Sequence, residues 1–128
     1  MRLTEKDAAI AYARAWNRLD CSEFLKLLDK NVHYASQWVF EELESKVAIS
    51  DYLIGKMETV KNTGSKVYAE LGNTRSGFAG RDCVFMAQGK KEEIQAVVIF
   101  EIANNKITRY DLCIPELLNV ERTGVYPI

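Results

Sequence analysis

His33 is the only histidine of the chain, and histidine is the residue type that changes charge near neutral pH. This makes His33 a candidate for proton transfer. It alternates with Val32 and Tyr34, which are more apolar and are expected to face inward. We therefore expect His33 to face solvent or a subunit interface, where a lone histidine more often has a structural role than a catalytic one.

Asp111 is the second candidate base, and it lies two residues after Arg109 in a stretch that reads as a strand. Side chains two apart on a strand share a face. Tyr110, Leu112 and Ile114 alternate with this pair and would make the better apolar lining. The pattern favours an Arg109–Asp111 salt bridge on the outer face, with a catalytic pair as the less common alternative.

The cysteines and glycines give no sign of a metal, cofactor or nucleotide site. Cys21, Cys83 and Cys113 are odd in number and lack C-x-x-C spacing, so we expect buried, reduced thiols without zinc or a disulfide. The sequence contains neither G-x-G-x-x-G nor a Walker lysine loop. We predict no cofactor and no bound metal.

Aromatic residues occur in every expected element, and several carry polar tips. Most large apolar side chains at such spacings belong to a core, but aromatic residues with polar tips also line ligand pockets. The expected lining of such a pocket consists of Tyr12, Trp16, Tyr34, Trp38, Tyr52, Phe85 and Tyr110.

Length and charge limit the class of protein. The chain has 128 residues, 48% of them hydrophobic, which suits a single domain over residues 1–128. Its 17 basic and 18 acidic residues are interspersed, which argues against nucleic acid or an anionic membrane as partner. No apolar run is long enough to span a bilayer and residues 1–7 are too polar for a signal peptide, so we expect a cytoplasmic protein.

Three helices are expected first. A Thr4 and Asp7 capping pair and apolar residues at three- and four-residue steps predict a helix over residues 4–19. A shorter helix should follow Asp20 or Ser22 and end near residue 30. A third helix should cover residues 46–61 and stop at Gly64.

The rest of the chain reads mainly as strands, and the fold class is α+β: three helices packed on a strongly curved sheet. The turns at residues 89–91 and 104–105 predict an antiparallel meander. Residues 96–100 are apolar on both faces, which suits a sheet covered by helices and by the second subunit of a homodimer. The apolar tail, residues 115–128, should pack over the pocket mouth or on a partner. The expected strands are 32–36, a second strand or irregular segment 38–43, and 66–72, 82–88, 93–103 and 106–114.

This element order resembles the nuclear-transport-factor-2-like superfamily, a cone-shaped α+β half-barrel that includes SnoaL-like proteins, ketosteroid isomerase and limonene epoxide hydrolase. The residues that carry the resemblance are 12–28, with the turn Asn17-Arg18-Leu19-Asp20, and 44–53, where Ser45 stands in place of the usual glycine of a Gly-Lys pair. The resemblance implies a small-molecule pocket inside the cone.

Only part of the isomerase site carries over. Tyr12 matches the tyrosine that stabilises an oxyanion, whereas the general base falls on or beside Ala35 and a second acid falls on Val97 or Val98. Alanine and valine cannot move a proton, so ketosteroid isomerisation is disfavoured. The hydrolase resemblance would need Asp82, Arg109 and Asp111 around a water.

The sequence thus predicts a SnoaL-like protein that binds a small apolar ligand in an aromatic-lined pocket. Any turnover would be a cofactor-free isomerase, lyase or hydrolase step, with Tyr12 as hydrogen-bond donor and His33 or Asp111 as base. The alternative is a non-catalytic interaction module or a dimeric structural protein. Fold analogy does not decide between them.

Overall fold

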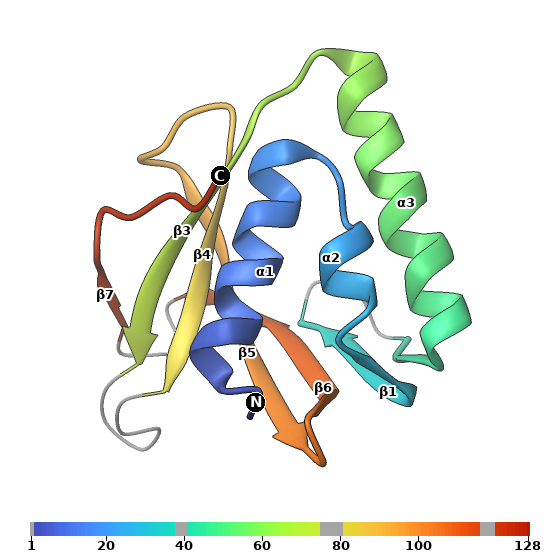
Figure 1. The fold of residues 1–128 in the computed structure, drawn as a ribbon. Coiled ribbons are helices and arrows are strands. Elements are labelled where there is room, and N and C mark those ends of the chain that lie inside the picture. Colours follow the sequence, from blue (N-terminus) through green and yellow to red (C-terminus); the bar gives the residue numbers. More distant parts are fainter. Residues whose placement is uncertain (1, 38–40, 75–80, 116–119) are drawn as a thin grey trace.

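The computed structural model describes residues 2–37, 41–74, 81–115 and 120–128 (Figure 1). The chain forms three helices and seven strands within these ranges. They are α1 (Glu5–Arg18), α2 (Ser22–Leu25), β1 (Leu28–Ser36), β2 (Leu43–Glu44), α3 (Lys46–Thr63), β3 (Val67–Thr74), β4 (Asp82–Gln88), β5 (Ile94–Ala103), β6 (Lys106–Cys113) and β7 (Val120–Arg122).

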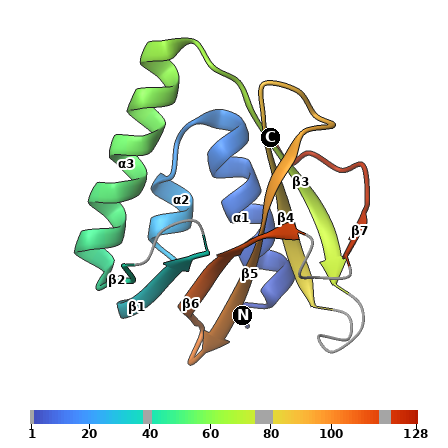
Figure 2. The ribbon, with the colours of Figure 1, turned by 180° about the vertical axis from the view of Figure 1, so that it is seen from behind.

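All seven strands belong to one sheet in the order β2-β1-β6-β5-β4-β3-β7. The expected antiparallel meander is confirmed over β4, β5 and β6, and β3 extends it. Among the strands of the described residues, β1 and β6 are the one parallel pair. The helices cover one face of the sheet, whose other face is seen from behind in Figure 2. The α+β class with three helices on a curved, open sheet is confirmed.

The first helix forms as expected because its ends are capped. Thr4 and Asp7 make a reciprocal capping box, with the Asp7 amide donating to the Thr4 hydroxyl at 3.1 Å and the Thr4 amide donating to the Asp7 carboxylate at 3.0 Å. The inner face of α1 is buried along its length, and Leu19 ends the helix in a left-handed conformation. This rigid helix sets the position of Tyr12 and Trp16.

The prediction for the second helix is wrong in length. It is a single turn, Ser22–Leu25, and β1 already begins at Leu28 rather than at Val32. Leu28 pairs with Ile107 on β6, and the Ile107 amide donates to the Leu27 carbonyl at 2.8 Å. Pairing with a strand about 80 residues away therefore takes the segment that local pattern assigned to a helix.

The third helix starts at a strained residue. Ser45 has φ 96°, a value that favours glycine, while its hydroxyl caps the helix by accepting from the Ala48 amide at 3.2 Å. Gly64, with φ 70°, ends the helix near the predicted position. Residues 38–43 are the segment expected as a second strand or irregular segment. Its last residue, Leu43, begins the short β2, and residues 38–40 lie outside the described residues.

The described part of the C-terminal tail packs along β3 of its own chain. β7 pairs with the edge of β3, and the tail ends beside α1 and β3 (Figure 1). Glu70, only 2% exposed, accepts from Arg122 Nε and the Gly124 amide, both at 2.7 Å, and from the Tyr126 hydroxyl at 3.2 Å. A buried carboxylate needs such partners, so this network fastens the tail to β3.

Among the described residues, no helix is both long enough and apolar enough to cross a membrane.

Candidate functional site

A cavity of about 350 Å³ lies between α1, α3 and the inner face of the sheet. Four of the aromatic residues singled out in the sequence line it. Tyr12 and Trp16 lie one helical turn apart on α1, Tyr34 comes from β1, and Tyr52 from α3. The complete described lining is Tyr12, Trp16, Tyr34, Ser36, Tyr52, Leu53, Lys56, Thr59, Val60, Val67, Met86, Ala87, Gln88, Gln95, Ala96 and Leu112.

The polar groups that face the deep end of this cavity are neutral hydrogen-bond donors. Tyr12 is 2% exposed and Tyr34 is 5% exposed. Burial raises the pKa of both phenols above the ordinary tyrosine value, because the phenolate would lose its hydration. Both phenols therefore stay protonated at any physiological pH and can donate a hydrogen bond to an acceptor.

Trp16 has an unsatisfied donor in this position. It is 9% exposed, and its Nε1–H is buried without a hydrogen-bond acceptor among the described residues. The indole lies close enough to the Tyr12 hydroxyl to lower the pKa of that phenol, although burial raises it by more. The indole NH and the Tyr12 hydroxyl do not meet hydrogen-bond geometry, so the indole NH has no acceptor among the described residues. Leaving such a donor unpaired costs roughly 1–3 kcal/mol, which an acceptor on a ligand would recover.

The described lining contains no aspartate, glutamate, histidine or cysteine. Lys56 is its only cationic side chain, and its Nζ lies 5.6 Å from the centre of the Tyr52 ring. General-base chemistry needs a proton acceptor within reach of the substrate. The described part of the pocket offers hydrogen-bonding groups and apolar surface, but no carboxylate or imidazole that could act as this base.

Tyr110, expected in the lining, lies behind it. Its ring centre is 4.5 Å from that of Tyr34 and 5.7 Å from that of Tyr12, in a cluster that includes Phe24 and Phe100. Burial holds the pKa of Tyr110 well above the ordinary value. Close packing of aromatic rings fixes their orientation, so Tyr110 and its neighbours position Tyr12 and Tyr34 instead of contacting a ligand.

Phe85, also expected in the lining, lies on the opposite face of the sheet. It packs there with Cys83, Val97, Ile99 and Cys113. Its neighbour Met86 is the residue of β4 that reaches the pocket. A Cβ at Gly72 would come within 2.1 Å of the Phe85 ring, so the absence of a side chain at Gly72 lets this ring lie against β3. Trp38 lies outside the described residues.

The two candidate bases also lie on the outer face, away from Tyr12. Arg109 donates to both Asp111 oxygens, with Nη2 at 2.9 Å and Nε at 3.1 Å, so the expected salt bridge is present. His33 Nδ1 lies 3.2 Å from Glu42 and 3.8 Å from Glu44. The structure therefore does not bring His33 or Asp111 together with Tyr12.

His33, Glu42 and Glu44 place three potential metal-ligating atoms within 4.8 Å of one another. Arg109 also forms an ion pair with Glu42 in this group. A divalent cation would compete with that guanidinium for the same carboxylate. The three side chains are well explained as a solvent-accessible ion-pair network.

Sequence reasoning missed several lining residues. Ser36 follows Tyr34 by two positions and so shares its face, and Lys56 follows Tyr52 by one helical turn. Both were accessible from periodicity. Gln88 and Gln95 flank the β4–β5 turn, and only the folded hairpin shows that they reach the pocket rim.

Comparison with solved structures places the fold. An NTF2-like protein of unknown function from Pseudomonas putida KT2440 matches with a TM-score of 0.61 and 11% identity, over 86% of this chain and 83% of that chain. A SnoaL-like protein of unknown function from Burkholderia thailandensis E264 matches with a TM-score of 0.58 and 12% identity, over 97% and 100%. A provisionally assigned polyketide cyclase from Pseudomonas putida KT2440 matches with a TM-score of 0.58 and 20% identity, over 86% and 90%.

No protein-family model and no curated protein matches the sequence. At these identities the structural matches establish the fold and nothing finer. The chain has the NTF2-like fold that the element order predicted, with helices packed on the inner face of a curved mixed sheet.

Proposed function

We propose that this protein binds a compact, mostly apolar molecule that presents a carbonyl or similar acceptor oxygen to Trp16 and Tyr12. The observation that carries the proposal is the buried, unpaired Nε1–H of Trp16 beside the neutral phenol of Tyr12. Two hydrogen-bond donors on adjacent turns of α1, in the lining of one cavity, suit a single acceptor atom on a ligand.

The size of the cavity limits the ligand. A dry apolar cavity of about 150 Å³ accommodates benzene. The pocket, at about 350 Å³, is roughly twice that volume and suits a body of about two rings. Leu53, Val60 and Met86 supply the apolar surface for such a body.

Binding is favoured over turnover because the described lining offers no carboxylate or imidazole base. The NTF2-like fold hosts both ligand-binding and enzymatic proteins, and one structural neighbour is provisionally assigned as a polyketide cyclase. Tyr12 could stabilise negative charge on a ligand oxygen, but His33 and Asp111 lie on the other face of the sheet. A proton-transfer reaction would therefore need a group that the ligand brings itself.

The homodimer and the cytoplasmic location remain predictions. Residues 96–100, whose two-sided hydrophobicity suggested a dimer, are all buried within the single chain. Light scattering on the purified protein would decide the oligomeric state. An interaction module is the second candidate, and it rests on Val47 and Ile54, two exposed apolar residues seven positions apart on α3.

Fluorescence titration with 6-propionyl-2-dimethylaminonaphthalene tests the binding proposal. This probe is a two-ring ketone of suitable size, and 2-dimethylamino-6-propylnaphthalene is a matched competitor in which a methylene replaces the acceptor carbonyl. We expect saturable one-site binding of the ketone with a Kd in the sub-millimolar range. This corresponds to a binding free energy of about 0.3 kcal/mol per heavy atom of the probe. The competitor without the carbonyl should displace the ketone probe only weakly.

Variants locate the binding site. Tyr12→Phe and Trp16→Phe each remove one donor while keeping a ring, and each should weaken ketone binding about five- to tenfold, the usual effect of one neutral hydrogen bond. Thr108→Val removes a hydroxyl on β6 that lies outside the pocket, and should leave the affinity unchanged. Equal affinities for all four proteins would refute the proposal.

A further inference from the structure

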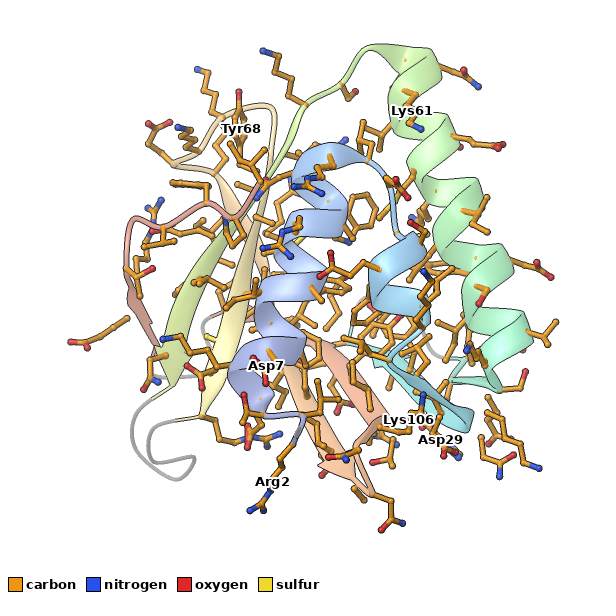
Figure 3. All side chains as sticks on the ribbon, in the orientation of Figure 1. Arg2, Asp7, Asp29, Lys61, Tyr68 and Lys106 are labelled. Carbon is orange, nitrogen blue, oxygen red and sulfur yellow. The ribbon has the colours of Figure 1, made fainter. Side chains whose placement is uncertain are left out.

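A second cavity, of about 380 Å³, lies next to the pocket. It is formed by the end of α1, the start of β3, the β4–β5 turn and the C-terminal tail. Its described lining is Trp16, Asn17, Leu19, Ser65, Lys66, Val67, Tyr68, Lys91, Tyr126 and Ile128. Figure 3 shows Tyr68 at this end of the sheet, across α1 from Lys61 on α3.

Trp16 and Val67 line both cavities. Two separate cavities that share two lining residues are neighbours, and the shared residues form the wall between them. Trp16 contributes the larger part of this wall because its indole is far larger than the Val67 side chain. Asn17 holds this end of α1 against β3 through hydrogen bonds to both backbone groups of Ala69.

The second cavity differs in chemistry from the first. Lys66 and Lys91 line it, and its described lining contains no aspartate or glutamate side chain. Lys91 Nζ lies 4.6 Å from the centre of the Tyr126 ring and 5.7 Å from that of Tyr68, in cation–π contact. Aromatic walls with two ammonium groups suit the anionic end of an extended ligand.

We propose that this second cavity, which opens to solvent, is an extension of the binding site that Trp16 separates from the pocket, and that Trp16 sets the maximum length of the ligand. The proposal rests on the proposed binding function. With Trp16 in place, the site takes compact acceptor-bearing molecules and rejects those with a long chain beyond the acceptor. Opening the wall connects the pocket to the second cavity with Lys66 and Lys91, and the site then accepts long chains that end in a carboxylate.

Three ketone probes with the same naphthalene fluorophore measure this limit. The first carries a three-carbon acyl chain, the second a twelve-carbon acyl chain, and the third the same twelve-carbon chain with a terminal carboxylate. The readout is the ratio of long-chain to short-chain affinity within each variant, because any loss of the Trp16 hydrogen bond cancels in this ratio.

Wild type should bind the short probe at least about tenfold more tightly than either long probe. Trp16→Ala should reverse the order, whereas Trp16→Phe, which keeps an aromatic wall, should retain the wild-type ratio. In the Trp16→Ala background, the carboxylate should increase affinity further, and Lys91→Gln should abolish that increase. Val67→Ala opens the wall from β3 with a smaller deletion and should shift the ratio in the same direction if Trp16→Ala does not fold.

The outcomes separate this inference from the proposed function. If folded Trp16→Ala and Val67→Ala bind the short probe but keep the wild-type ratio, or if wild type binds long and short probes equally, the length limit is refuted and the binding function stands. If wild type does not bind the short probe, both proposals fail.

Discussion

The side chain of Asn17 and the backbone of Ala69 are joined by two hydrogen bonds. Asn17 Nδ2 donates to the Ala69 carbonyl at 2.8 Å, and the Ala69 amide donates to Asn17 Oδ1 at 2.9 Å. Nδ2 also donates to the Pro127 carbonyl at 2.7 Å. One side chain thus ties α1, β3 and the tail together, and it directly follows the Trp16 that separates the two cavities.

Asn17→Ala should lower the free energy of unfolding by about 1–3 kcal/mol, because it leaves partly buried backbone groups of Ala69 without partners. Urea unfolding followed by circular dichroism measures the change. Asn62→Ala is the matched control on the exposed face of α3, where we expect a change of no more than about 0.5 kcal/mol. Equal effects at both positions would show that Asn17 does not hold these elements together.

Ser45 combines a useful side chain with an unfavourable backbone, and two substitutions separate them. Ser45→Gly should raise the free energy of unfolding by about 1 kcal/mol, because glycine relieves the strain at φ 96° and costs only a few tenths as a cap. Ser45→Ala should lower it by about 1 kcal/mol, because it loses the cap and keeps the strain. Thermal unfolding of the pair would contradict this explanation if both variants changed stability in the same direction.

Alkaline pH should destabilise the fold. Burial raises the pKa of the phenols of Tyr12, Tyr34 and Tyr110 above the ordinary value of 10, so the folded chain keeps protons that the unfolded chain releases. These phenols therefore do not change the free energy of unfolding below about pH 9 and lower it above about pH 10, by about 1.4 kcal/mol per pH unit for each group.

Two thiols add to this loss. Burial raises the pKa of Cys113 to about 11 and that of Cys83 to about 12, from an ordinary value of 9. Urea midpoints measured between pH 8 and pH 11 should thus fall progressively, and tyrosinate absorbance should rise in step with unfolding for these phenols. A midpoint that stayed constant to pH 11 would refute this prediction.

His33→Ala and Asp111→Asn should leave the affinity for the short ketone probe within about twofold of wild type. Both side chains lie on the outer face of the sheet, His33 beside Glu42 and Asp111 in an ion pair with Arg109, so neither reaches the pocket. Because these pairs are partly exposed, each substitution should cost no more than about 1 kcal/mol of stability. A large loss of affinity in either variant would contradict this placement and show that the residue contributes to the binding site.

Local pattern was sufficient for the helices that have clear ends and for much of the pocket. The Thr4 and Asp7 capping box marked α1, and helical and strand periodicity placed Tyr12, Trp16 and Tyr34 on inward faces. The pocket lining was thus accessible wherever an element was long and had one apolar face.

Local pattern failed where distant pairing or two-sided hydrophobicity decided the outcome. The short α2 results from pairing of Leu28 with Ile107, and the tail is held by Glu70 and Arg122, which are 52 residues apart. Phe85 lies in β4, where buried apolar residues occupy both faces, so alternation could not tell which face it joins.

The resonance of the Trp16 indole NH tests the central claim most directly. The chain has two tryptophans, and Trp16→Phe assigns the Trp16 signal in a ¹H–¹⁵N correlation spectrum. We predict that this signal moves downfield in proportion to the bound fraction of 6-propionyl-2-dimethylaminonaphthalene and stays in place with 2-dimethylamino-6-propylnaphthalene, because only the ketone offers a carbonyl to the indole NH. If the ketone binds and the Trp16 signal does not move, the acceptor lies elsewhere and the proposed site is wrong.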